Sequence, residues 1–334
     1  MIIAIDAMGG DHAPKEIVEG AVEALKYMES DIMLIGDENK INNVLESLKF
    51  DITRIEVEHT TEVIENEDKP VVAIKRKRDS SMVRGLDLLK KKEIDGFVSA
   101  GNTGALLAGG LLRTGRIRGI DRPAIASVFP MDNKMGILTD AGANAEVKSK
   151  NLVEFATMGA YYGELVLGIE NPKIGLVNVG SEKGKGTALV QETYELLEQS
   201  NLNFIGNIEG RDIPFGVADI VVTDGFTGNI ILKLTEGVAK SFSNNLKTVF
   251  KKNILSMIAG LMVKKGFDDF KKKLDYTEYG GAPLLGVNGA LVKAHGSSNA
   301  KATMNAILYT EKYINSGVIE KIKKYVENRS EEIE

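Results

Sequence analysis

The sequence predicts an α/β protein built on a doubly wound, mostly parallel sheet in α/β/α layers. Short runs of Ile, Val and Leu alternate along the chain with amphipathic segments of helical period, an order typical of parallel sheets. The apolar runs are continuous, which indicates strands covered on both faces. Glycine-rich clusters follow several of these runs directly, at the strand ends where the functional loops of such folds lie.

The expected elements follow in order along the chain. The first expected helix begins with Pro14, a residue favoured in the first turn of a helix. The other helices are expected where apolar residues recur at three- and four-residue spacing. The expected strands are residues 2–5, 32–35, 96–99, 124–129, 135–139, 174–177 and 219–222, and the expected helices are 14–28, 80–92, 104–113, 147–163 and 187–199.

Length and composition suit a single α/β catalytic domain over residues 1–334, with an amphipathic insertion at about 250–270. The chain has no cysteine, which excludes disulfides, thiolate metal sites and a cysteine acyl-enzyme. Its three histidines argue against a catalytic zinc site. The net charge of -5 argues against general polyanion binding, so we expect no nucleic-acid partner. No apolar run approaches the roughly 20 residues that span a bilayer, and the first residues read as a strand, so we expect a cytoplasmic protein.

Five glycine clusters each follow an expected strand and precede an expected helix. Backbone N–H groups at such helix starts bind anions, although tight turns alone also explain any single cluster. None of the clusters matches a common nucleotide motif, because 180–187 has the wrong spacing for a P-loop and no Gly-x-Gly-x-x-Gly follows the first strand. We therefore expect phosphate as the ligand and no cofactor. The clusters are residues 8–11, 100–104, 140–144, 180–187 and 224–229.

Polar side chains in and near these clusters are the candidate phosphate ligands. The asparagines, serines and threonines have turn or cap formation as their structural alternative. The lysines of the 180–187 cluster bind either phosphate or an acidic partner, and a solvated loop is their alternative. The candidates are Asn102, Thr103, Asn144, Ser181, Lys183, Lys185, Thr227, Asn229, Ser297 and Ser298.

The clusters are part of a larger set of sequence blocks that resembles the PlsX-type phosphate acyltransferases and, more distantly, the phosphotransacetylases. The resemblance implies the layered fold that phosphotransacetylases share with isopropylmalate dehydrogenases. It also implies conversion of acyl-[acyl carrier protein] and inorganic phosphate to acyl phosphate for phosphatidic acid and phospholipid synthesis. The implied partners are acyl carrier protein, a second copy of the chain and a membrane glycerol-3-phosphate acyltransferase. The blocks that carry the resemblance are 5–14, 78–82, 99–105, 139–146, 178–187, 223–229 and 280–298.

The segment 286–299 holds the main catalytic candidates. An expected strand at 290–292 places Lys293 and His295 on one side, since alternate residues of a strand share a face. His295 can hold the thioester oxygen or protonate the leaving thiolate, and in the phosphotransacetylase resemblance it lies near the position of a catalytic arginine. Asp224 can orient Lys293 or act as a base, with helix capping as its alternative. Because the chain has no cysteine and no Gly-x-Ser-x-Gly elbow, we expect bound phosphate to attack the thioester directly.

Residues 250–267 place an apolar block between two lysine pairs. Ile254, Ile258, Leu261 and Met262 fall on one helical face, which suits an interfacial helix or the tip of a helical hairpin. The lysines would attract anionic lipid headgroups or receive the acyl carrier protein, whose acidic character the resemblance implies. We therefore expect peripheral association with the inner face of the cell membrane. The alternative is a helix buried in the core or in a dimer.

Two other functions stay open on the sequence alone. One is a phosphotransacetylase-like enzyme that uses acyl-CoA. The other is a non-catalytic scaffold that recruits lipid-synthesis enzymes to the membrane, for which Lys293 and His295 would be dispensable. A dehydrogenase of the isopropylmalate type shares the broad fold, but the chain shows no matching cofactor constellation.

Overall fold

The computed structural model describes residues 1–48, 53–132, 134–274 and 280–331. Strands that the sequence did not predict are β3 (Ile55–His59), β8 (Phe204–Glu209) and β10 (Ala282–Leu285). The first two lie at the edges of the sheet and are only partly buried, so they lack continuous apolar runs. The predicted strands are all present, as β1 (Ile2–Asp6), β2 (Asp31–Gly36), β4 (Gly96–Ser99), β5 (Ala124–Pro130), β6 (Met135–Thr139), β7 (Ile174–Asn178), β9 (Ile220–Val222) and β11 (Ala290–Lys293).

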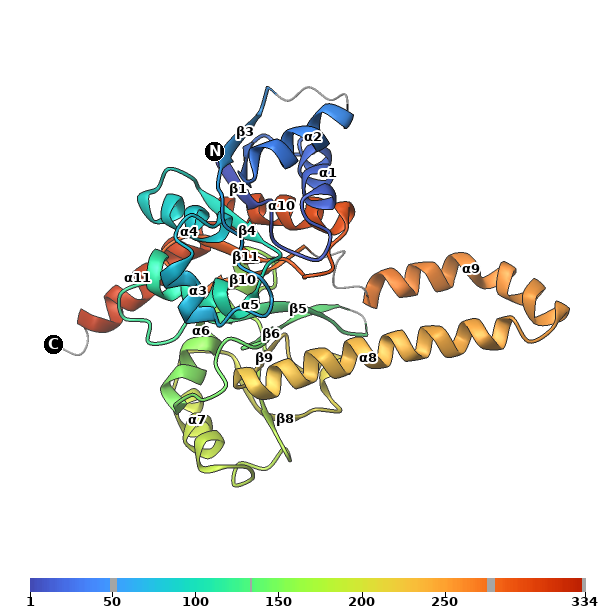
Figure 1. Ribbon diagram of the computed structural model, residues 1–334. Coiled ribbons are helices and arrows are strands. Elements are labelled where there is room, and N and C mark those ends of the chain that lie inside the picture. The colour runs from blue at the N-terminus through green and yellow to red at the C-terminus, as the bar shows by residue number, and fades with distance from the viewer. Residues whose placement is uncertain (49–52, 133, 275–279, 332–334) are drawn as a thin grey trace.

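The strands form one eleven-stranded sheet in the order β3-β2-β1-β4-β11-β10-β5-β6-β9-β7-β8. Within the described sheet, β10 is antiparallel to both β11 and β5, and β5 is antiparallel to β6. The other pairings are parallel. Helices cover both faces (Figure 1). The predicted doubly wound, mostly parallel α/β fold is confirmed.

Two buried clusters form the core, one on each face of the sheet. Alternate residues of β1 divide between them, because Ile3 and Ile5 enter one cluster and Ala4 the other. The first cluster is covered by α1 (Lys15–Ala24), α2 (Glu38–Leu48), α6 (Ser149–Leu165), α7 (Ala188–Glu198), α10 (Ala300–Asn315) and α11 (Val318–Glu331). The second is covered by α3 (Pro70–Arg76), α4 (Ser81–Lys91) and α5 (Thr103–Gly109), which continues into the π-helical turn Gly110–Thr114.

The strand direction reverses in the middle of the sheet. β1, β4, β11 and β5 run one way, whereas β6, β9 and β7 run the other way. The short strand β10 lies between β11 and β5 and runs against both, with Ala282 paired with Lys293 and Leu284 paired with Ile125. The end of β11 therefore lies close to β5, and side chains from the two halves of the sheet come together at this point.

Helices α8 (Gly225–Phe250) and α9 (Ile254–Leu274) form a hairpin that projects from the body of the molecule (Figure 1). The projection is longer than the segment 250–270 marked in the sequence, because α8 begins at the sheet. Its tip is strongly apolar and exposed, with Ile254 74%, Leu261 72% and Met262 82% accessible. These side chains are therefore not buried in the core of this chain. In the described part of the chain, no helix is both long and apolar enough to cross a bilayer.

The first turn of α8 packs directly on the loop that follows β6. A Cβ atom on Gly228 would lie 1.9 Å from the backbone carbonyl oxygen of Asp140, and one on Gly225 would lie 2.7 Å from the carboxylate of Asp140. The Gly225 N–H donates to the carbonyl of Asn144 at 2.8 Å. The base of the hairpin can approach the sheet this closely only because both positions lack a side chain.

We expect Gly228→Ala to lower the free energy of unfolding by about 1–3 kcal/mol, because the backbone has to move to admit the methyl group. Gly237→Ala is the matched control on the same helix, since nothing lies within 4 Å of its would-be Cβ atom. It should raise stability by up to ~1 kcal/mol through helix propensity. Urea denaturation of both variants measures the difference, and the same change in both would contradict the close packing of α8.

Candidate active site

A cleft of about 210 Å³ lies at the reversal of strand direction. Its walls come from the end of β11, from β5, from the residues before β10, from the start of α5 and from the first turns of α8. The polar lining side chains predicted from the sequence are Thr103, Asn229, Lys293 and His295, and those not predicted are Ser127, Lys233 and Glu236. The structure thus brings together four of the candidate residues from three distant parts of the chain.

Lys293 ends β11 beside the end of β4. Its Nζ donates to the carbonyl oxygen of Ala100 at 3.3 Å and to that of Ala294. Burial, with a smaller contribution from the charge of Lys233, lowers the pKa of Lys293 to about 8, while Asp6 and Asp11 oppose the shift. At neutral pH the group is still mostly an ammonium ion. Because it is largely shielded from water, solvent competes little with an anion that binds to it.

Among the charged groups that act on Lys293, the buried Asp6 carboxylate has the largest effect on its pKa. It ends β1 and accepts hydrogen bonds from the hydroxyls of Ser81 at 2.6 Å and Ser99 at 2.7 Å. Burial raises its pKa, while these hydroxyls and the charge of Lys293 favour the ionised form. A Cβ atom on Gly9 would lie 2.4 Å from the Asp6 carboxylate, so this glycine allows the first loop to close over it.

His295 lies partly buried at the rim of the cleft, two residues after Lys293. Its Nδ1 accepts a hydrogen bond from the backbone N–H of Ser297 at 3.2 Å and contacts the Ser297 hydroxyl at 2.8 Å. Burial first, and then the charge of Lys233, lowers the pKa of His295. The ring is therefore neutral near pH 7, and because Nδ1 is an acceptor its proton is assigned to Nε2. Ser298 is buried and donates its hydroxyl to the carbonyl of His295 at 2.7 Å, so it supports the loop.

One face of α8 completes the cleft. Asn229, Lys233 and Glu236 follow each other at helical spacing, and Lys233 and Glu236 form an ion pair at 2.9 Å. Their helical spacing after the predicted Asn229 is the sequence pattern from which Lys233 and Glu236 could have been predicted. Asp224 caps the helix instead of reaching Lys293, because its carboxylate accepts hydrogen bonds from both the backbone N–H and the hydroxyl of Thr227 at 2.8 Å. For Asp224 and Thr227 the structure therefore shows the capping alternative.

Two predicted phosphate ligands instead form hydrogen bonds that hold loops of the protein together. The Asn102 amide donates to the carbonyl oxygens of Glu65 at 3.1 Å and Asn66 at 3.0 Å, and its oxygen caps α5. The Asn144 amide donates to the carbonyl oxygen of Pro123 at 2.7 Å and to the carboxylate of Asp140 at 2.9 Å. Their donors are thus engaged by the protein itself, and they shape the loops around the cleft.

The loop after β7 lies apart from the cleft. Ser181, Lys183 and Lys185 are exposed and do not line it. Lys183 instead forms an ion pair with Glu198 and stands 5.2 Å from the ring centroid of Tyr194. Of the five glycine clusters, those at 100–104, 140–144 and 224–229 contribute lining residues to the cleft, and the one at 180–187 does not. Among the described residues, no group of three or more His, Asp or Glu side chains is arranged to hold a metal ion.

We expect Asp6→Asn to lower the pKa of Lys293 below its value of about 8, because the substitution removes the main charge that favours the ammonium form. Asp11→Asn is the control, since Asp11 is exposed and opposes the shift less strongly. Titration of labelled lysine side chains by NMR measures both. An unchanged Lys293 pKa in Asp6→Asn would show that the two groups are not coupled.

Comparison with known proteins places this chain in a family. The family model described as "Fatty acid synthesis protein" matches residues 1–321. A phosphate acyltransferase of Alkaliphilus oremlandii is 56% identical over 326 residues, which cover 98% of this chain and 97% of that protein. A phosphate acyltransferase of Clostridioides difficile is 50% identical over 333 residues, with 99% and 98% covered.

Among solved structures, a phosphotransacetylase from Streptococcus pyogenes superposes with a TM-score of 0.62 at 17% identity and covers 94% of each chain. A phosphotransacetylase from Staphylococcus aureus superposes with a TM-score of 0.60 at 16% identity, also over 94% of each chain. At this identity these structures show that the fold is shared. The full-length matches to the curated relatives go further and confirm the resemblance seen in the sequence. The chain is an enzyme that belongs to the phosphate acyltransferase family.

Proposed function

We propose that this enzyme transfers a fatty acyl group from acyl carrier protein to inorganic phosphate and so supplies acyl phosphate for phospholipid synthesis. The observation that carries the proposal is the cleft in which Lys293, Lys233 and His295 converge. It combines positive charge for an oxyanion with a neutral imidazole and has no thiol, since the chain lacks cysteine. The names of the curated relatives support the same acceptor.

The cleft supplies what direct attack by phosphate requires. The ammonium groups of Lys293 and Lys233 hold the phosphate dianion, with Thr103 and Asn229 as further donors. A phosphate oxygen attacks the thioester carbonyl carbon, and the Nε2–H of His295 donates to the oxyanion that develops. The carbon–sulfur bond then breaks, and the proton of the hydrogen phosphate passes to the leaving thiolate. The products are acyl phosphate and the free thiol, and no acyl-enzyme forms.

We expect acyl phosphate from long-chain acyl-[acyl carrier protein] and phosphate without added metal or nucleotide, because the lysines themselves supply the positive charge. The assay compares acyl carrier protein and coenzyme A as donors at equal concentration and follows acyl phosphate as its hydroxamate. Turnover with coenzyme A thioesters alone would favour a phosphotransacetylase-like enzyme. Loss of activity in chelator, restored only by a divalent ion, would contradict metal-free catalysis.

His295→Ala should lower turnover about 10²–10³-fold, the usual cost of one preorganised donor to an oxyanion. Lys293→Ala should lower kcat/KM for phosphate, because it removes a charge that holds the phosphate dianion. In the wild type, kcat/KM for phosphate should fall above pH about 8, because Lys293 loses its charge as the pH rises through its pKa. Lys293→Arg, whose side chain stays charged, should move this fall to higher pH. Thermal melts control for folding, and a pH profile shared by Lys293→Arg and the wild type would remove Lys293 from phosphate binding.

We further propose that the hairpin tip holds the enzyme on anionic membranes. The exposed side chains of Ile254, Ile258, Leu261 and Met262 supply apolar area, worth roughly 25 cal/mol per Å² removed from water. Paired lysines on either side of this block add about 1 kcal/mol each near an anionic surface. Both contributions are modest, so binding should be reversible and weaker at high salt.

Leu261→Glu should therefore reduce co-sedimentation with anionic vesicles and leave the melting temperature unchanged, because Leu261 is 72% exposed. Gln199→Glu adds the same charge directly after the end of α7, away from the hairpin, and should sediment like the wild type. A lowered melting temperature or a changed oligomeric state, with unchanged sedimentation of Leu261→Glu, would instead assign the tip to a protein interface.

A further inference from the structure

A second, apolar groove adjoins the catalytic cleft. It measures about 330 Å³ and is lined by Val128, Met135, Leu167, Leu308 and Tyr309, with Asn305 and Lys312 as its polar lining residues. The groove is distinct from the catalytic cleft and from the hairpin tip, because it lies between β5, β6 and α10.

The groove and the cleft share a wall. Val128 lines both, and Gly280, which lines the cleft, packs on Tyr309, which lines the groove. A Cβ atom on Gly280 would lie 2.5 Å from the Cβ atom of Tyr309. Val128 and the contact between Gly280 and Tyr309 thus belong to the wall between the two spaces.

The backbone ladder is open at this wall. β10 pairs with β5 at Ile125 and Ala124, and Val128, further along β5, pairs with Ile137 of β6 on the opposite side. In the described sheet, no strand of the β10 side pairs with Val128. In the described sheet, a flexible ligand chain that extends from Lys293 toward Val128 therefore crosses no pair of hydrogen-bonded strands.

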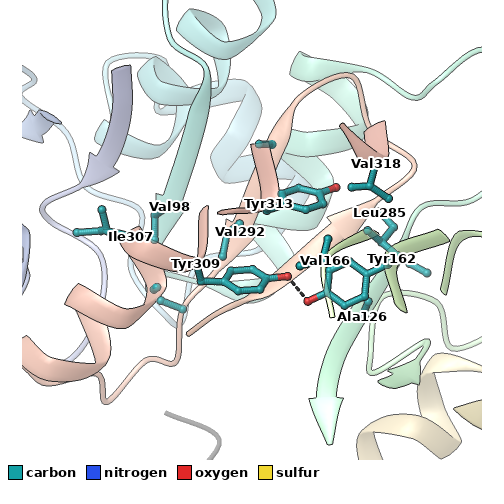
Figure 2. Packing of buried hydrophobic residues seen from close by; sticks show 14 of the residues in the cluster. Val98, Ala126, Tyr162, Val166, Leu285, Val292, Ile307, Tyr309, Tyr313 and Val318 are labelled. Carbon is teal, nitrogen blue, oxygen red and sulfur yellow. Dashed lines mark hydrogen bonds between the residues drawn. The ribbon is translucent and has the colours of Figure 1, made fainter. Parts of the chain in front are cut away.

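The far wall of the groove is rigid. Tyr309 is 8% exposed, its hydroxyl is hydrogen bonded to that of the fully buried Tyr162, and its ring stacks on Tyr313 at 6.4 Å (Figure 2). Because three packed aromatic rings hold this wall in place, the groove keeps one shape. A groove of fixed shape limits the length of the alkyl chain that fits.

We propose that the groove bounded by Val128, Leu167, Leu308 and Tyr309 receives the distal methylenes of the acyl chain and thereby sets which chain lengths are used. This inference rests on the proposed acyl transfer and adds the site of the chain to it. The chain leaves the thioester carbon in the cleft, passes over Val128 beside Gly280, and lies along Leu167 and Leu308. The apolar face of the hairpin is then left for another contact.

Leu167 gives the sharpest test, because it lines the groove and not the cleft. Leu167→Trp should shorten the groove and lower kcat/KM for long chains by about fourfold per excluded methylene, the ratio that corresponds to about 0.8 kcal/mol. Short-chain donors should react as with the wild type. Leu167→Ala should shift the optimum to longer chains. Leu196→Trp, in a separate groove of α6, α7 and α11, is the control and should leave the profile unchanged.

A wild-type experiment covers the case in which the variants fold poorly. A thioester whose terminal carbon carries a diazirine should, after irradiation, label peptides that contain Leu167 or Leu308. Labelling of residues 254–263 alone, or chain-length profiles that are identical in all active variants, would overturn the groove assignment. Absence of acyl phosphate from every donor with the wild type would instead overturn the proposed function.

Discussion

The site depends on one buried charge pair, Asp6 and Lys293. Each ion by itself would be costly to bury. Burial raises the pKa of Asp6 and lowers the pKa of Lys293, and each residue favours the charged form of the other. The two residues end strands β1 and β11, which both neighbour β4, so the pair spans the centre of the sheet. Ser81 and Ser99 donate hydrogen bonds to the carboxylate, and Lys293 lines the cleft.

Around this pair, glycine decides how closely the backbone segments approach. Gly9 and Gly101 lie against the Asp6 carboxylate, and Gly225 and Gly228 lie against the Asp140 loop. In each case a methyl group would meet a carboxylate or a backbone atom at a distance shorter than or near van der Waals contact. The glycine clusters thus serve mainly to bring polar segments together, and the positive charge that faces the cleft comes from lysine side chains.

The sequence predicted the part of the site that is local along the chain. Lys293 and His295 were found because two-residue spacing on a strand is visible without a structure, and the continuous strands were found because both of their faces are buried. Asp6 was missed as the partner of Lys293, because the two are far apart in sequence and meet only through the strand order. Lys183 was predicted in the site on the strength of its glycine loop, and the structure places it beside Glu198 instead.

The central claim is that phosphate binds against the Lys293 ammonium, and proton uptake on binding tests it most directly. At pH 8, close to its pKa, Lys293 is about half protonated, and a bound phosphate dianion should draw it to full charge. Calorimetric titration with phosphate in buffers of different ionisation enthalpy should therefore show uptake of about half a proton per phosphate in the wild type, and almost none in Lys293→Ala. Equal uptake in both proteins, or none in the wild type, would contradict the account.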